Sequence, residues 1–495
     1  MTKNPLSLSL SLQQVAALAA AGGTAIDPEA PYAELWMGTH PSGPSEIIAD
    51  DGESSGNRSL QSFLDEHGAA AVGAASAARF GARALPFLFK VLSVRTALSI
   101  QSHPDKKLAE RLHAEKPEVR REGGRVGFEE REGQRENVDD DENSLTKKTF
   151  KTLFKKRNQW YKDDNHKPEM AIALGDDFSA LCGFADPREI AEALAKVPEL
   201  RGVVGEAASA ALEKAAAAAA DGGGGVEAFK PALREAFTAL MTAEPEPVGD
   251  AVDALVARVG GGAAGAEVSE SLRSKLALAV VLAGQYPRDV GVLAAFFLNH
   301  LRLRDGEAVA LAANEPHAYV SGQLVECMAA SDNVVRAGLT PKPRDTAVLC
   351  ASLSYATGAP AVLRGEPVQE FVSRYDPSFA EFEVARIEVP AGRDTLLPPS
   401  GGAAVLLVAG EDGGGAEVAA TATPLGEGSP LRRVVSAKRG DVLFIPAGTP
   451  LALVAAAGGK PFVAWLASVN AAVVGPGTVV APAAAPAGAP TLAAA

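Results

Sequence analysis

Residues 313–342 constrain the fold more than any other stretch of the chain. Short apolar runs there are interrupted by single polar side chains, namely His317, Glu326, Arg336 and Lys342. Runs of this length are typical of β-strands that bury one face and present polar side chains on the other. Residues 306–313 form a further strand pattern that leads into Pro316 and His317. Because a small β-barrel commonly presents a metal-binding histidine at such a turn, we expect a barrel that carries a polar site.

Length and charge bound the architecture and the partners. At 495 residues, the chain exceeds the roughly 250–300 residues at which single cores usually split, so we expect two or three domains. Its net charge of −14 argues against nucleic acid as a partner, because phosphate backbones attract surfaces rich in Lys and Arg. A phosphorylated small molecule is compatible with this charge, since it needs only a local basic pocket. The sequence has no uninterrupted apolar run of about 18 residues, so we expect no membrane partner.

The cysteines indicate the compartment. Cys182, Cys327 and Cys350 lack CxxC spacing and are too few for a disulfide framework. We interpret them as packed thiols in a reducing environment, and we expect a cytoplasmic protein.

A change of pattern at residue 185 divides the chain. Asp186 is a good helix N-cap, Pro187 suits the first helical position, and apolar residues then recur at spacings of three and four. We therefore predict helices over 185–290, forming an insertion that packs against the barrel and carries no chemistry. After Lys342 short β-runs return, and no histidine follows His317. These runs predict a second β domain without a metal site.

Residues 120–160 follow neither pattern. They are rich in charged residues, include an acidic run at 139–142 and have little apolar periodicity. Such a segment buries too little apolar surface to fold, so we expect a disordered insertion outside the core. We favour a translated intron over a regulatory insertion as its origin.

Two further segments carry candidate ligands. Gln101 and His103 follow the apolar run 85–100, and two residues that are two apart in a strand face the same side. A histidine with an amide oxygen is a less common zinc set than a histidine with cysteine or carboxylate, so this spacing alone favours a core histidine. Lys167 and Glu169 are also two apart, so a cation can lie beside a carboxylate ligand.

Four blocks in order resemble those of the type I phosphomannose isomerases, which are zinc enzymes of the cupin superfamily. One block is 313–342, and the others are 32–45, 85–106 with Gln-Ser-His-Pro-Asp-Lys at its end, and 161–170 with Asn-His-Lys-Pro-Glu-Met at its end. Any one block can arise by chance, whereas four in family order are specific. The resemblance implies a mainly β fold with α: a cupin-type β-barrel (jelly-roll) catalytic domain, a helical insertion domain and a second, C-terminal cupin-like β domain.

The resemblance also suggests where these domains begin and end. We expect the first part of the catalytic domain at 1–184, the helical insertion domain at 185–290, the second part of the catalytic domain with the active-site strands at 291–345, the C-terminal β domain at 346–474 and a flexible Ala/Pro/Gly tail at 475–495.

The resemblance implies a zinc-dependent aldose-ketose isomerase with one zinc ion per chain. The substrate would be a phosphorylated hexose, with D-mannose 6-phosphate and D-fructose 6-phosphate interconverted through a cis-enediol to feed the supply of GDP-mannose. The implied zinc ligands supply two nitrogens and two oxygens, and they are Gln101, His103, Glu169 and His317.

Charged residues near these ligands are candidates for the remaining roles. Arg336 is always cationic and can stabilise the charge that develops on the enediol, although a structural ion pair is its alternative. For the base that moves the proton, we rank Glu326 first and then Lys167 or His166, and for His166 a structural role fits equally well. The candidate phosphate contacts are Ser99, Lys90 and Lys342.

Two other classes of cupin protein compete with the isomerase. One is a non-catalytic cupin that binds a sugar or a metal, and the other is a metal-dependent cupin dioxygenase. An oxygenase site would be dominated by histidine, whereas Gln101 among the ligands suits a phosphosugar site. The presence of Glu326 and Arg336 beside all four ligands disfavours an inert binder. We expect a monomer.

Overall fold

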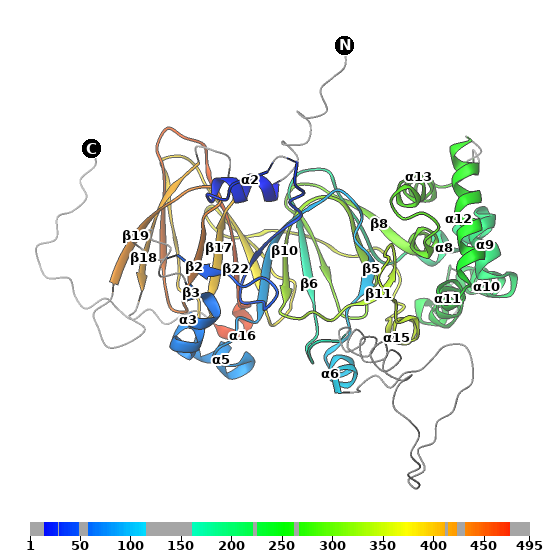
Figure 1. Cartoon of the computed structure of the whole chain (residues 1–495), viewed down its shortest axis with the longest axis horizontal. Helices are drawn as coiled ribbons and strands as arrows, with labels where there is room; N and C mark the ends of the chain where they lie inside the picture. The colour runs from blue at the N-terminus through cyan, green and yellow to red at the C-terminus, as the bar shows by residue number, and fades with distance from the viewer. Residues whose placement is uncertain are drawn as a thin grey trace, which may run out of the picture.

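The computed structural model describes residues 14–27, 29–48, 58–114, 161–220, 225–261, 267–410, 414–422 and 431–475. Within them, β-sheets form the middle and one end of an elongated molecule, and helices form the other end (Figure 1). The insertion expected at 120–160 lies outside the described residues, as does the expected tail beyond residue 475.

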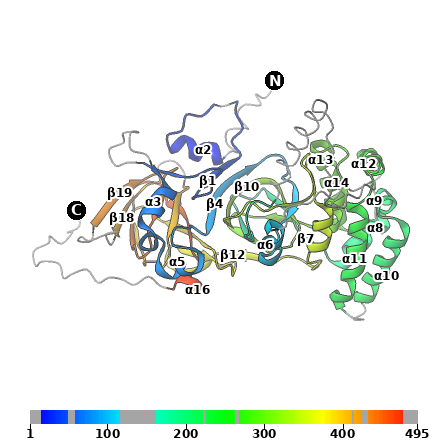
Figure 2. The same ribbon diagram turned by 60° about the horizontal axis from the view of Figure 1, so that its bottom comes forward.

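The middle region is a ten-stranded sheet in which every pair of neighbouring strands is antiparallel. Its strands are β1 (Glu34–Met37), β4 (Phe87–Val94), β5 (Ile100–Ser102), β6 (Glu169–Ala173), β7 (Phe178–Phe184), β8 (Leu298–Leu303), β9 (Glu307–Leu311), β10 (His317–Ala329), β11 (Val335–Gly338) and β12 (Val362–Arg364). Figure 2 shows these strands between the C-terminal sheets and the helices.

β10 is the strand around which this sheet is built. Its C-terminal half pairs with β4 and β6, and its N-terminal half pairs with β5 and β7. The register on β7 shifts between Tyr319 and Ser321, and Gly322 follows with a φ of 102°. A Cβ atom at Gly322 would lie 2.6 Å from the Cα atom of Phe178, so the close approach of β7 requires glycine. One strand thereby contributes to both halves of the sheet.

The helical end comprises α8 (Pro187–Lys196), α9 (Pro198–Val204), α10 (Glu206–Ala220), α11 (Gly225–Met241), α12 (Pro245–Gly260), α13 (Glu270–Gln285) and α14 (Val290–Ala294), followed by the 3₁₀ turn η3 (Ala295–Phe297). Asp186 caps α8 by accepting a hydrogen bond from the backbone N–H of Arg188, and Pro187 begins the helix. Buried Phe237 and Leu282 belong to one core cluster with Leu181 of β7. The predicted helical insertion domain, packed against the sheet, is confirmed.

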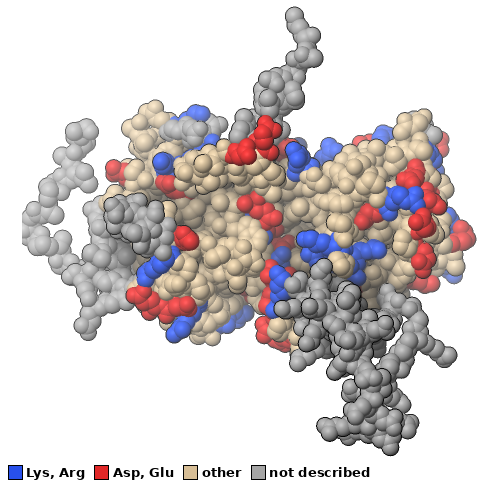
Figure 3. Space-filling view, in the orientation of Figure 1, with Lys and Arg blue, Asp and Glu red and all other residues tan. Residues whose placement is uncertain are grey.

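Acidic and basic side chains intermingle on the surface of this helical domain (right side of Figure 3). Arg288, for example, pairs with Glu246 and Asp250, and Arg201 pairs with Glu206. Exposed pairs of this kind contribute little to stability and no chemistry.

Two packed sheets form the opposite end. One has six strands, which are β13 (Glu366–Gln369), β14 (Val372–Tyr375), β15 (Glu383–Val389), β17 (Ala404–Val408), β20 (Val442–Ile445) and β22 (Phe462–Ser468), and the other has four, which are β16 (Asp394–Leu397), β18 (Ala416–Ala422), β19 (Leu431–Ala437) and β21 (Leu451–Ala455). Leu406, Leu453 and Phe462 belong to the apolar core of this end. The predicted C-terminal β domain, and with it the mainly β fold with α, is confirmed.

The C-terminal domain and the catalytic sheet share a core. Phe89 and Val325 of the catalytic sheet belong to one buried cluster with Val405 and Trp465. Helix α2 (Gln14–Ala21) lies above the junction of the two domains (Figure 1). Gln14 receives a hydrogen bond from Arg439 of the C-terminal domain and donates its backbone N–H to Gln323 Oε1 of β10.

Short elements complete the described chain, and these are β2 (Glu46–Ile47), β3 (Arg58–Ser59), α3 (Leu60–His67), α4 (Ala69–Val72), α5 (Ala74–Phe80), α6 (Lys106–Ala114), α15 (Thr346–Ser352) and α16 (Ala471–Val474). None of the helices in the described residues is long and apolar enough to cross a membrane.

Two local expectations about strands are wrong. Gln101 and His103 do not continue the strand of the preceding apolar run, because β4 ends at Val94 and His103 itself follows the end of β5. Lys167 is not on a strand with Glu169, since β6 begins at Glu169. His103 and Lys167 thus lie in irregular segments next to these strands.

Candidate metal centre and active site

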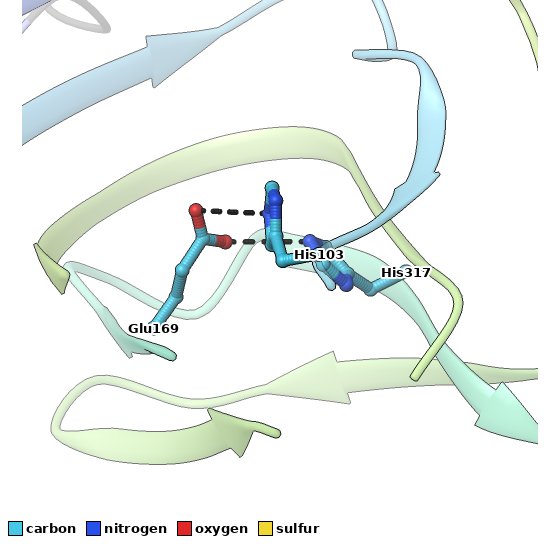
Figure 4. A group of neighbouring side chains, drawn as sticks. All are labelled: His103, Glu169 and His317. Atoms are coloured by element: carbon cyan, nitrogen blue, oxygen red, sulfur yellow. Dashed lines mark ion pairs between the residues drawn. The ribbon is translucent and has the colours of Figure 1, made fainter. Parts of the chain in front are cut away.

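Three buried side chains from three segments of the ten-stranded sheet and its connections face one another (Figure 4). His103 follows β5, Glu169 begins β6 and His317 begins β10, and each side chain is at most 2% exposed. The Nε2 atom of His103 lies 3.2 Å from Glu169 Oε1, and the Nε2 atom of His317 lies 3.3 Å from Glu169 Oε2. The three donor atoms lie within 4.8 Å of one another.

This group fits a metal ion. His103 Nε2, Glu169 Oε2 and His317 Nε2 are all buried without a hydrogen-bond partner. Buried polar atoms without partners are rare and costly, so three that face one another indicate a shared cation. Two imidazole nitrogens and a carboxylate are a donor set that zinc accepts.

A hydrogen bond at Nδ1 fixes the tautomer of each histidine. His103 Nδ1 lies 2.7 Å from the backbone oxygen of Asn333, and His317 Nδ1 lies 3.0 Å from the backbone oxygen of Glu315. Because a carbonyl oxygen only accepts, each Nδ1 carries the proton and donates it. Each Nε2 therefore offers its lone pair to the group.

The local electrostatics keep the ligands in the forms that bind a cation. Burial lowers the pKa of His103 to about 4, although Glu169 opposes this shift, so the ring is neutral near pH 7. Burial by itself would raise the pKa of Glu169, yet the ammonium group of Lys167 holds that pKa well below its usual range. Lys167 Nζ lies 2.7 Å from Glu169 Oε1, although Lys167 reaches the carboxylate from the segment before β6 and not from a shared strand.

A second buried ionic group lies farther along β10. Glu326 is 4% exposed and forms an ion pair with Lys90 of β4, at 3.1 Å between Lys90 Nζ and Glu326 Oε2. Tyr319 donates its hydroxyl to Glu326 Oε1 at 2.7 Å. Burial tends to lower the pKa of Lys90, but Glu326 and neighbouring Glu34 raise it overall, so Lys90 stays charged.

Arg336 on β11 is half-buried beside Gln101 of β5. Within the described ranges its guanidinium has no hydrogen bond or ion pair, so the alternative of a structural ion pair finds no partner there. Burial lowers the pKa of Arg336 from its high usual value.

Comparisons with known proteins decide the family. The family model for the type I phosphomannose isomerase catalytic domain matches residues 10–123 and 144–186, and that for the helical insertion domain matches residues 203–298. Mannose-6-phosphate isomerase 2 of Arabidopsis thaliana is 39% identical over 450 residues, which cover 90% of this chain and 85% of the relative. The Bos taurus mannose-6-phosphate isomerase is 38% identical over 446 residues, which cover 86% and 87%. This chain belongs to the type I phosphomannose isomerase family.

Solved structures agree. A crystal structure of mannose 6-phosphate isomerase bound with zinc and yttrium has a TM-score of 0.66 and 26% identity, with 93% of this chain and 98% of that chain covered. A mutant of phosphomannose isomerase from Salmonella typhimurium has a TM-score of 0.67 and 27% identity, with the same coverage. The sequence-based predictions of the family and of an isomerase are confirmed.

The remaining residues predicted for this phosphomannose isomerase site lie in different surroundings. The side-chain oxygen of Gln101 accepts a hydrogen bond from half-buried Ser99 at 3.3 Å. His166 turns toward the C-terminal domain, where its Nε2 atom lies 2.7 Å from Glu381 Oε1. Lys342 is exposed, and its backbone N–H donates to Thr340 Oγ1. The roles assigned to these residues stay predictions.

Sequence reasoning missed two residues of the site. Tyr319 contacts Glu326, and its spacing of two from His317 would have placed it on the same strand face. Asn333 contacts His103 through a backbone carbonyl, and no side-chain pattern carries that information.

Proposed function

We propose that this phosphomannose isomerase interconverts D-mannose 6-phosphate and D-fructose 6-phosphate through a cis-enediol and depends on one zinc ion per chain. The observation that carries the proposal is the buried His103, Glu169 and His317 group with its three unpartnered donor atoms. Gln101 follows Ser99 on the neighbouring segment, and we propose its side-chain oxygen as the fourth ligand.

The chain's own residues set up this site before substrate arrives. When bound, zinc would supply a Lewis acid that polarises an oxygen of the sugar. Lys167 lies against Glu169 and balances its charge. Arg336, whose guanidinium has no partner among the described residues, would face the substrate and stabilise negative charge that develops on its oxygens.

The isomerisation moves a proton between C1 and C2 of the sugar, and it needs a base. We propose Glu326 in this role, with Lys167 and then His166 as the alternatives. Tyr319 and Lys90 each hold one oxygen of the Glu326 carboxylate, which fixes its orientation. His166 ranks last because Glu381 already holds its ring.

The substrate's phosphate needs cationic or hydroxyl contacts at the edge of the site. We propose Lys342 and Ser99 for these contacts, and Lys90 as a weaker candidate because Glu326 already pairs with it. Lys342 lies in the irregular segment that follows Arg336 and the end of β11. Its side chain is exposed, so its ammonium group can contact a phosphate group at the surface.

The wider setting follows from the same activity. We propose a cytoplasmic monomer that feeds the supply of GDP-mannose and has neither nucleic acid nor membrane as a partner. We also propose the domain boundaries expected from the sequence, with catalytic parts at 1–184 and 291–345 on either side of the helical domain at 185–290; β12, from beyond residue 345, adds an edge strand to the catalytic sheet.

One assay tests the proposed function. Purified protein loaded with zinc is incubated with mannose 6-phosphate, and the formation of fructose 6-phosphate is followed; we expect turnover that a chelator abolishes and added zinc restores. A non-catalytic binder would retain the sugar without forming product. Absence of product from folded, zinc-loaded protein would overturn the proposal.

A further inference from the structure

The two histidines of the metal group are held in different ways. His317 donates to the carbonyl of Glu315, two residues earlier on its own turn. His103 instead donates to the carbonyl of Asn333, a residue 230 positions away in the chain. The orientation of His103 therefore depends on whatever holds Asn333 in place.

The side chain of Asn333 is fully buried, and the two N–H groups of its amide reach three acceptors of one segment, so one N–H is shared between two of them. Its Nδ2 atom donates to the backbone oxygen of Asp163 at 2.7 Å, to the backbone oxygen of Asn165 at 2.9 Å and to Asp163 Oδ1 at 3.1 Å. These bonds tie the turn after β10 to the turn before β6. Both turns are irregular, so no strand ladder fixes them.

The Asp163 carboxylate completes this tie. Its Oδ1 atom accepts from Ser331 Oγ at 2.8 Å and from the backbone N–H of Asn165 at 3.0 Å. Its Oδ2 atom accepts from the backbone N–H of Asp332 at 2.8 Å. An ionised carboxylate makes stronger hydrogen bonds than a neutral acceptor, so one side chain organises the two residues that precede Asn333.

We propose that Asp163 and Asn333 form a clasp that positions His103 for the metal ion, although neither residue belongs to the metal group itself. The clasp fixes the Asn333 carbonyl, the carbonyl keeps the proton on Nδ1 of His103, and Nε2 is left to face Glu169. Asp163 and Asn333 are thus positioning residues for metal affinity. The inference rests on the proposed function only in taking the His103, Glu169 and His317 group to hold zinc.

Zinc affinity of the full chain tests the clasp directly. Metal-stripped wild-type protein and the Asp163→Asn and Asn333→Ala variants are titrated with zinc against a chromophoric chelator. Losing a partner of a ligating histidine typically weakens binding about 10- to 100-fold, and we expect that range for each variant. Asp164→Asn is the matched control, because Asp164 is exposed and its side chain pairs with Lys106, away from Asn333; its zinc affinity should stay within about twofold of wild type.

Two further measurements separate positioning from a general structural role. Because both residues act on one carbonyl, the double variant should bind zinc about as weakly as the weaker single variant. With cobalt in place of zinc, the visible spectrum of either variant should change, since one histidine is no longer held.

The outcomes distinguish this inference from the proposed function. Zinc affinity and a cobalt spectrum equal to wild type in a folded Asn333→Ala or Asp163→Asn variant overturn the clasp alone, even if the variant melts earlier. A wild-type chain that takes up no zinc overturns both the zinc-dependent function and the clasp.

Discussion

The catalytic sheet and the C-terminal sheets bury different kinds of side chain. The catalytic sheet encloses a carboxylate with two histidines and, farther along β10, the ion pair of Lys90 and Glu326. The core of the C-terminal sheets is apolar, as at Leu406 and Phe462. Burying charged groups lowers the stability of the folded state, whereas burying apolar side chains raises it. The two domains also share a core, so the C-terminal sheets can stabilise a catalytic sheet that gives up stability for its chemistry.

The largest effect is expected from His317→Ala, which removes a ligand from the catalytic sheet. The variant should lose both its zinc and its activity, because the three remaining proposed ligands, with only one histidine among them, hold the ion too weakly. Metal analysis of the purified protein and the isomerase assay check this. His113→Ala, at an exposed histidine of α6, is the control and should keep both. Stoichiometric zinc and near-normal turnover in His317→Ala would show that the ligand assignment is wrong.

Arg336→Ala should come next, with turnover lowered about 100-fold or more, the scale of losing one preorganised electrostatic donor. The guanidinium has no lone pair to offer a metal, so zinc content should be unchanged. Thermal stability should change little, since no described residue pairs with the side chain. Arg302→Ala, at an exposed arginine of β8, serves as the control. A variant that melts early but turns over normally while folded would contradict this role.

A core substitution in the C-terminal sheets should separate stability from turnover. Leu406→Ala removes a fully buried side chain and should lower the free energy of unfolding by about 2–5 kcal/mol, measured by denaturant titration. Turnover per folded molecule should stay near wild type. Leu396→Ala is the control, because that leucine of β16 is 64% exposed. If folded Leu406→Ala protein had no turnover, the C-terminal sheets would contribute to catalysis as well as to stability, and the contrast between the two domains would be wrong.

The smallest effect is expected from deleting 120–160. The sequence predicts that joining Val119 to Tyr161 leaves activity intact or raises soluble yield, because a charged, aperiodic segment buries little apolar surface. The catalytic family model also leaves 124–143 unmatched. Comparing the isomerase rate and yield of the shortened and full chains checks the prediction. A folded deletion variant without activity would mean that the segment contributes to the site.

Features that depend on local sequence were predictable. Asp186 and Pro187 predicted the start of α8 correctly, because an N-cap residue and a first-turn proline favour a helix start through interactions within one turn. His103, Glu169 and His317 came from blocks resembling a known family, and the structure brings their donor atoms together. Spacing alone would have left His103 as a core histidine.

Features that depend on register or on backbone atoms were not predictable. Lys90 was expected to meet a phosphate, but its pairing with Glu326 follows from the register of β4 on β10, in which the two residues are opposite each other. For His166 the sequence left proton transfer and a structural role equally open, and it gave no sign of the contact with Glu381 of the C-terminal domain. Neither contact leaves a pattern along the chain, because each joins segments that are distant in sequence.

The register shift between Tyr319 and Ser321 changes which face of the sheet the later side chains of β10 point to. Tyr319 and Glu326 are seven residues apart, so on a regular strand they would point to opposite faces of the sheet. Their hydrogen bond shows that they share a face, because the extra residue of the bulge reverses the alternation. Losing a single residue here would therefore turn Glu326 to the other face of the sheet while His317 kept its place. Tyr319 and Glu326 are an odd number of residues apart, and only a strand with a bulge can place two such residues on the same face.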